Sequence, residues 1–229
     1  MNPAKALTLA SDPDLAARVA AKDTVAFEVL MRRYNGRLFR VARAILQDDA
    51  EAEDALQDAY LSAYAKIAGY RGDSALATWL TRIVINEALG RLRRRKRDGV
   101  VVPFSGATQT DQDEEAANVR DDPSDSPETA TLRAELRRLL ERRIDELPVA
   151  FRTVFLLREV EEMTAAEAAQ CLSIPEATVR TRLFRARALL REALSRDLDA
   201  TTLDVFAFAG VRCDRIVTGV LARLERLPA

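Results

Sequence analysis

The stretch that decides the fold class reads TAAEAAQCLSIPEATVRTRLFRARALLREAL at residues 164–194. Thr164 precedes an alanine-rich segment and Glu167 follows three residues later, a pattern typical of a capping box at a helix N-terminus. Pro175 fits the start of a second helix. The sequence therefore predicts a helix over 165–172, a turn at 173–175 and a longer basic helix over 176–197. A short helix, a tight turn and a longer basic helix are typical of a helix-turn-helix.

The longer helix of this pair has two different faces. Val179, Leu183, Ala186 and Leu190 form an apolar stripe, and the arginines lie away from it. Such a helix can pack on a domain with one face and enter a major groove with the other, where guanidinium groups bond guanine edges and phosphates. The alternative is an ordinary solvated basic face, which the preceding turn and helix make less favourable. The arginines of this helix are Arg180, Arg182, Arg185, Arg187 and Arg191.

Upstream, helical periodicity continues with few interruptions. Apolar residues from Phe27 to Ile45 recur at spacings of three or four, which predicts one helix with an apolar face. Two more helices are predicted at about 49–67 and 75–95, separated by a turn signal at residues 69–73. Further helices are predicted at 132–145 and 149–161, with Pro148 between them. The expected fold class is all-α.

The segment YRGDSALATWLTRIVINEALGRLRRRKR at residues 70–97 combines aromatic, amide and basic side chains. Trp79, Arg82 and Asn86 can share one helical face, where an aromatic ring can stack on an unpaired base and arginines can hold phosphates. Core packing is the competing interpretation of Trp79, because tryptophans are usually largely buried. Asn86 could be an ordinary exposed polar residue. The basic block at 91–97 could be a solvated helix end favoured by the helix dipole.

The helix predicted at 49–67 carries acids along its length, from Asp48 to Asp58. Acid enrichment at a helix N-terminus explains the first of them but not Asp58. An acidic helix beside a basic one fits two partners, a protein surface and a nucleic acid.

Composition limits the remaining classes. The 229 residues include 8 glycines, 8 prolines, two cysteines and no histidine, with a net charge of −1. The absence of histidine argues against His-dependent catalytic triads and most catalytic zinc sites, so no enzyme, cofactor, metal or small-molecule substrate is expected. No apolar run approaches membrane-spanning length and no signal peptide is recognisable, which predicts a cytoplasmic, non-embedded protein. Cys171 is expected to fill core space, and a Cys171–Cys213 redox switch is a minor alternative.

Residues 98–131 contain prolines, small polar residues and acids, which predicts a flexible linker. Its acidity could serve solvation or could mimic nucleic acid in a positively charged channel. The predicted domains are therefore 14–97 and 132–197. Residues 1–12 are expected to be frayed, and the 198–229 extension is expected to form a loop followed by an amphipathic helix.

Two long segments resemble one family. DDAEAEDALQDAYLSAYAKI with YRGDSALATWLTRIVINEAL resembles region 2 of extracytoplasmic-function sigma factors, and LPVAFRTVFLLREVEEMTAAEAAQCLSIPEATVRTRLFRARALLREAL resembles their region 4. The matches occur in the family's order. The 198–229 extension departs from the family's short form, and a role in packing on region 4 or on a regulator is a hypothesis.

The resemblance implies a transcription initiation factor that binds RNA polymerase core, directs it to −35 and −10 promoter elements and promotes melting. It implies that region 2 docks on the clamp coiled coil of the largest subunit and that region 4 docks on the flap of the second-largest subunit. An anti-sigma factor is a further implied partner. The free protein is expected to hold its two domains loosely, with polymerase fixing their spacing.

The resemblance also implies three sets of site residues. The −10 set is Tyr70, Arg71, Ser74, Trp79, Arg82, Asn86, Arg91, Arg93 and Arg94. The −35 set is Thr178, Arg180, Thr181, Phe184, Arg185 and Arg187. The core-polymerase set is Asp49, Glu53, Asp54, Leu56, Gln57, Asp58 and Tyr60. A dimeric helix-turn-helix regulator is the main rival, but it accounts only for residues 164–197.

Overall fold

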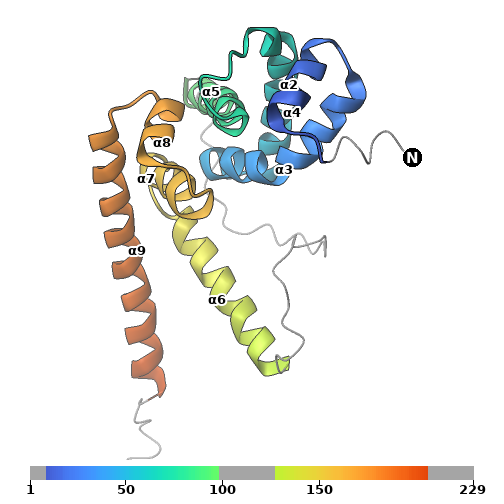
Figure 1. Cartoon of the computed structure of the whole chain (residues 1–229). Coiled ribbons are helices and arrows are strands. Elements are labelled where there is room, and N and C mark those ends of the chain that lie inside the picture. Colours follow the sequence, from blue (N-terminus) through green and yellow to red (C-terminus); the bar gives the residue numbers. More distant parts are fainter. Residues whose placement is uncertain (1–8, 98–126, 206–229) are drawn as a thin grey trace, which may run out of the picture. The chain divides into compact units, whose positions relative to one another are not determined.

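The computed structural model describes residues 9–97 and 127–205, and every regular element in these two ranges is a helix (Figure 1). The predicted all-α fold class is confirmed. The predictions for the linker acids, the helix near the C-terminus and Cys213 lie outside the described residues.

Within residues 9–97 the α-helices are α2 (Asp12–Ala20), α3 (Thr24–Leu46), α4 (Asp49–Lys66) and α5 (Leu76–Arg97), with a short 3₁₀ turn, η1 (Ile67–Gly69), after α4. Side chains set their starts. Ser11, Asp23 and Asp48 cap α2, α3 and α4 by accepting backbone N–H bonds, which satisfies donors that a helix leaves unpaired. The frayed tail was predicted to reach residue 12, whereas Asp12 opens α2.

Apolar faces of these helices meet in one core. Helices α3, α4 and α5 pack against one another, and α2 covers α3. Leu30, Leu38, Ile45 and Ile85 are at most 1% exposed, so the apolar face predicted over residues 27–45 is the buried face of α3.

The C-terminal part contains α6 (Pro127–Asp145), α7 (Val149–Phe155) with a π-helical turn η2 (Leu156–Val160), α8 (Ala165–Leu172) and α9 (Glu176–Val205). Two predicted boundaries were wrong. Residues 127–131 belong to α6, because Pro127 begins a helix, a position that suits proline. Residues 198–205 belong to α9, because no glycine or proline ends that helix. The chain divides into two compact units. The first unit ends at Ala188, and the second begins at Leu189 within α9.

Helices of the C-terminal part contact those of the N-terminal part within the first unit, with α8 against α5 and α7 against α3. Buried residues from both parts belong to one apolar cluster. Loose tethering of the two parts was expected, and the structure differs because these helices pack together.

Candidate functional site: a groove and two helical surfaces

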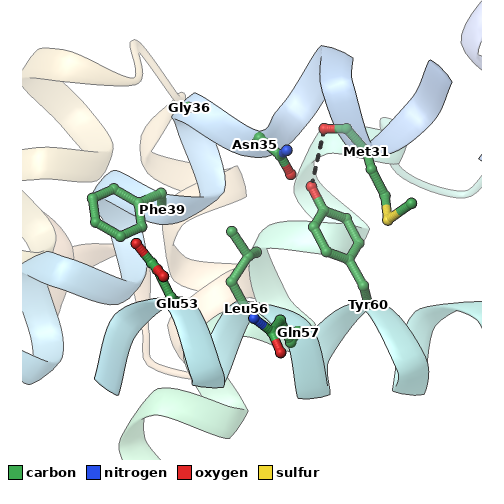
Figure 2. A pocket seen from close by; sticks show the side chains of 8 residues that line it. All are labelled: Met31, Asn35, Gly36, Phe39, Glu53, Leu56, Gln57 and Tyr60. Carbon is green, nitrogen blue, oxygen red and sulfur yellow. Dashed lines mark hydrogen bonds between the residues drawn. The ribbon is translucent and has the colours of Figure 1, made fainter. Parts of the chain in front are cut away.

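A groove of about 430 Å³ lies between α3 and α4 (Figure 2). It brings together four residues of the predicted core-polymerase set: Glu53, Leu56, Gln57 and Tyr60. Leu56 and Tyr60 are buried at its base, while Glu53 and Gln57 are exposed. The sequence analysis did not identify the α3 side of the groove, which consists of Met31, Asn35, Gly36 and Phe39.

Tyr60 fixes one end of the groove. Its hydroxyl donates a hydrogen bond of 3.3 Å to the backbone oxygen of Met31 (Figure 2). Burial raises the pKa of Tyr60 well above its ordinary value, so the phenol stays protonated and keeps this donor role. The groove therefore has a fixed apolar base and a polar rim.

The other acids of α4 have different partners. Asp48 accepts from the backbone nitrogen of Glu51 and so caps the helix, as the N-terminal explanation of these acids predicted. Asp49 pairs with Arg43 at 2.6 Å. Asp54 is exposed.

Asp58 pairs with Arg91 of α5, so a predicted polymerase contact and a predicted DNA contact bind each other. Arg91 also lies 3.5 Å from a Glu51 carboxylate oxygen and 3.3 Å from one of Glu87. Its side chain is only 19% exposed. In this structure Arg91 joins α4 to α5.

The remaining −10 candidates lie on α5 and the loop before it. Tyr70 and Trp79 pack ring to ring with centroids 5.5 Å apart, and the Tyr70 hydroxyl donates to the Ser74 backbone oxygen at 2.7 Å. Trp79 is half-buried against the core, so part of its ring packs internally and part remains accessible. Arg82 and Asn86 are exposed further along α5.

Three further candidates lie at the two ends of this surface. Arg71 is exposed in the loop, next to Gly72, whose φ of +76° suits glycine. Arg93 and Arg94 are exposed in the last turns of α5, and Arg94 pairs with Glu87 at 3.2 Å. Apart from half-buried Ser74 and the paired Arg91, the predicted −10 set is thus one aromatic pair with exposed polar and basic side chains.

The predicted helix-turn-helix geometry is present at α8 and α9. The capping box is confirmed: Thr164 Oγ1 accepts from the Glu167 backbone nitrogen at 3.2 Å, and the Glu167 carboxylate accepts from the Thr164 backbone nitrogen at 2.8 Å. The hydrogen bonds that the Thr164 backbone nitrogen and side chain donate to the Glu167 carboxylate lower the pKa of this group. Ser173 adopts a left-handed conformation, φ 53°, where the chain turns. The predicted α9 stripe is buried at Val179, Leu183, Ala186 and Leu190.

The opposite face of α9 presents the predicted −35 residues. Phe184 is 75% exposed, an unusual position for a large apolar ring, and Thr181 and Arg185 are also exposed. Arg180 pairs with Glu176 at 2.7 Å and Arg187 with Glu159 at 2.8 Å, and both keep more than half of the side chain exposed. Thr178 is half-buried.

The sequence analysis missed a charged network between the two parts of the chain. It consists of Arg37, Arg40 and Arg43 of α3 with Asp145, Arg152 and Glu161. The arginines at 37, 40 and 43 recur every three residues, which places them on neighbouring positions of one helix, and this spacing was the available signal. No group of acids, cysteines and histidines suited to a metal ion occurs in the described ranges.

Comparison with known proteins accounts for both halves of this arrangement. A family model for sigma-70 region 2 matches residues 30–98, and one for sigma-70 region 4 matches residues 137–190. The RNA polymerase sigma-H factor of Pseudomonas aeruginosa is 36% identical over 82% of this chain and 96% of its own length. The ECF RNA polymerase sigma factor SigM of Mycobacterium tuberculosis is 35% identical over 80% of this chain and 85% of its own. The chain belongs to the extracytoplasmic-function (ECF) sigma factors.

Solved structures agree with this assignment. A structure of CnrH in complex with the cytosolic domain of CnrY matches with a TM-score of 0.56 and 25% identity over 81% of this chain and 98% of that one. The sigma factor RpoE of Bartonella quintana, solved in complex with the anti-sigma factor NepR, shares the fold with a TM-score of 0.54 at 22% identity over 74% of this chain and 96% of that one.

Family membership decides between the two DNA-binding functions that the sequence left open. The chain is a sigma factor, a transcription initiation factor with region 2 and region 4 domains, and not a dimeric helix-turn-helix regulator. Sigma factors are not known enzymes. Within the described residues, no helix combines the length and apolar character that a membrane crossing requires.

Proposed function

We propose that this sigma factor docks on RNA polymerase through the α3–α4 groove, reads a melted −10 element with α5 and reads a duplex −35 element with α9. The observation that carries the proposal is the separation of three surfaces on one chain: an apolar-based groove, an aromatic and basic helix, and an exposed recognition helix. The polymerase provides nucleotidyl transfer and this chain provides start-site selection. We expect the protein to lie in the cytoplasm, because it acts on polymerase.

The groove suits a helical partner. Apolar side chains at its base and polar side chains at its rim are the arrangement that accepts an amphipathic helix. The family resemblance implies that this partner is the clamp coiled coil of the largest polymerase subunit. We expect region 4 to make a second contact, with the flap of the second-largest subunit.

The −10 surface supports capture of unpaired bases. Stacking on an aromatic ring contributes about 1–3 kcal/mol per base, and Trp79 keeps part of its ring accessible beside exposed Arg82 and Asn86. Trapping unstacked bases shifts the duplex towards the open state. We expect Trp79→Ala to impair melting more than polymerase binding, because Trp79 lies on α5 and not in the groove.

We also propose control by an anti-sigma factor. CnrH, which is 25% identical to this chain, was solved in complex with the cytosolic domain of another protein, CnrY. Binding of a comparable partner here would hold the sigma factor away from polymerase.

The deciding experiment is transcription in vitro with purified core polymerase on a library of genomic promoters. We expect the full chain to associate with core and to select discrete start sites, from which the promoter motif can be read. Gln57→Arg places a charge in the groove and should reduce association at least tenfold. Lys66→Gln changes an exposed residue halfway around α4 and should have no effect. A chain that neither binds core nor directs start sites would refute the proposal.

A further inference from the structure

Two of the −35 candidates, Arg180 and Arg187, are held by carboxylates in different ways. Arg180 pairs with Glu176, which lies one turn earlier on the same helix, and their side chains are 70% and 45% exposed. An exposed pair of this kind contributes little to stability. Arg187 pairs instead with Glu159, which lies 28 residues away in η2, and the distance from Nη2 to Oε1 is 2.8 Å. This second pair links the recognition helix to another element.

The turn that carries Glu159 is fixed on both sides. Leu157, two residues before it, is fully buried, and Glu161, two residues after it, is 9% exposed. The backbone nitrogen of Glu161 donates to the Leu156 oxygen at 3.0 Å, and that of Met163 donates to the Leu157 oxygen at 3.0 Å. Glu159 itself keeps 30% of its side chain exposed. Its carboxylate is therefore an accessible charge on a fixed backbone.

Helix α9 is also fixed in its rotation where Arg187 lies. Ala186, the residue before it, has no exposed surface, and Leu183, one turn earlier, is 9% exposed. Arg187 itself keeps 54% of its side chain exposed. A guanidinium group has five N–H donors in a planar fork. Because Glu159 accepts from Nη2, further donors of the same fork remain for a second anion.

The position of Arg187 along α9 favours a phosphate as that second anion. In a helix-turn-helix, the N-terminal residues of the recognition helix contact the base edges. Glu176 begins α9, and Arg187 follows it by about three turns, or about 16 Å along the helix axis. The major groove is about 12 Å wide. A helix that enters the groove with its first turns therefore brings Arg187 to the sugar–phosphate backbone, and phosphate contacts fix the register of a protein on DNA.

We propose that Glu159 is a positioning residue that increases promoter specificity by holding Arg187 towards one phosphate beside the −35 element. This inference rests on the proposed function of α9. Because the carboxylate fixes its direction, the guanidinium bonds a phosphate well only where α9 is seated in the groove. On an unrelated duplex the same carboxylate offsets the charge of Arg187 and weakens its attraction to the backbone. Glu159 therefore lowers non-specific binding and favours the correct site.

Holoenzyme assembled from the full chain and core polymerase tests this role. Fluorescence anisotropy measures its binding to two duplexes of equal length, one with the −35 element selected by transcription and one with that element scrambled. Core polymerase contributes equally to both, so the ratio of the scrambled to the selected dissociation constant reports how well the −35 element is read. A series of salt concentrations reports the number of phosphate contacts. Thermal unfolding of each free chain reports stability separately.

Glu159→Gln keeps the shape of the side chain and removes its charge. We expect the ratio to fall by about threefold to fivefold, the range of the stronger partly exposed ion pairs. The scrambled duplex should bind more tightly and with a steeper salt dependence, because Arg187 then acts on phosphates with its full charge. A purely structural role of Glu159 would lower the unfolding midpoint and leave the ratio and the salt dependence unchanged. Glu162→Gln is the matched control, since it makes the same charge change at an exposed residue nearby, and it should match the parent.

Arg187→Met supplies the second half of the test, because it removes the guanidinium and keeps an unbranched apolar side chain. In this background Glu159→Gln should no longer change the ratio or the salt dependence. An equal change with and without Arg187 would show that Glu159 acts through its charge alone, and it would overturn the proposal. So would an unchanged ratio in Glu159→Gln while the parent holoenzyme discriminates between the duplexes. A parent holoenzyme that does not discriminate would refute the proposed function of α9 as well.

Discussion

Arg152 is 3% exposed and caps two helices at once. Its guanidinium donates to the backbone oxygens of Ala44, Asp145 and Leu147. Ala44 lies in the last turn of α3 and Asp145 ends α6, where helix carbonyls have no partner within the helix. A cation at helix C-termini is also favoured by the helix dipole. We predict that Arg152→Met strongly destabilises the protein.

The magnitude follows from the three acceptors. A buried carbonyl that loses its partner costs about 1–3 kcal/mol. The Asp145 oxygen also accepts a hydrogen bond from Gln47, so the two carbonyls of Ala44 and Leu147 give an upper range near 6 kcal/mol. Two terms reduce this figure. Removing the guanidinium relieves its own desolvation, which lowers the pKa of Arg152 in the folded protein, and water can reach some of the carbonyls after relaxation. We expect a net loss of about 2–4 kcal/mol, a large share of the 5–15 kcal/mol typical of a domain.

Urea unfolding of the full chain measures this loss. Trp79, the single tryptophan, reports region 2 by fluorescence, and far-UV circular dichroism reports all helices. Arg152→Lys keeps the charge but has fewer donors, so it should fall between the parent and Arg152→Met. Arg32→Met is the control, because Arg32 is 76% exposed and its ion pair is with Glu28, one turn away on the same helix, and it should cost less than about 1 kcal/mol. A loss below 1 kcal/mol for Arg152→Met would refute the capping argument.

Three further predictions concern other parts of the chain. Thr164→Ala removes the capping-box oxygen and should lower stability by about 1 kcal/mol in thermal unfolding; an unchanged midpoint would contradict the role of the cap. Burial raises the pKa of Cys171 from 9.0 to about 12, so the unfolded thiol ionises first and stability should fall as pH rises above 9. The difference from Cys171→Ala should reach about 1.4 kcal/mol at pH 10, and parallel pH profiles for the two proteins would exclude this linkage. Arg185→Ala should weaken binding to the selected −35 duplex by about 1–3 kcal/mol in fluorescence anisotropy, and equal loss on random duplex would show that Arg185 contacts only phosphates.

Local patterns predicted the local structure well. The capping box at Thr164, the turn before α9 and the buried α9 stripe all follow from interactions within a few residues. The two helix boundaries that were wrong also have local causes. Pro127 was assigned to the linker although proline suits a helix start, and α9 continues past residue 197 because nothing in its sequence stops it.

Contacts between distant residues could not be predicted in the same way. Arg40 and Glu161 are separated by 121 residues, and no periodicity within either helix pairs them. Arg91 shows the same limitation, since its place in a basic block suggested DNA contact while its nearest partner, Asp58, lies on α4. The sequence predicted which helices carry acidic or basic residues. Which of these charges pair with each other depends on how the helices pack. The roles of the −10, −35 and polymerase residues remain predictions.

The ion pair between Asp58 and Arg91 has a consequence for mutagenesis of this protein. A substitution at Asp58 changes a residue proposed to dock on polymerase, and it also removes one of the carboxylates that restrain Arg91 on α5, the helix proposed to read the −10 element. A variant such as Asp58→Ala therefore perturbs two steps of initiation together. Its transcription defect can be assigned to one step only by comparison with Arg91→Ala, which leaves the docking face of α4 in place and breaks the same link from the other end.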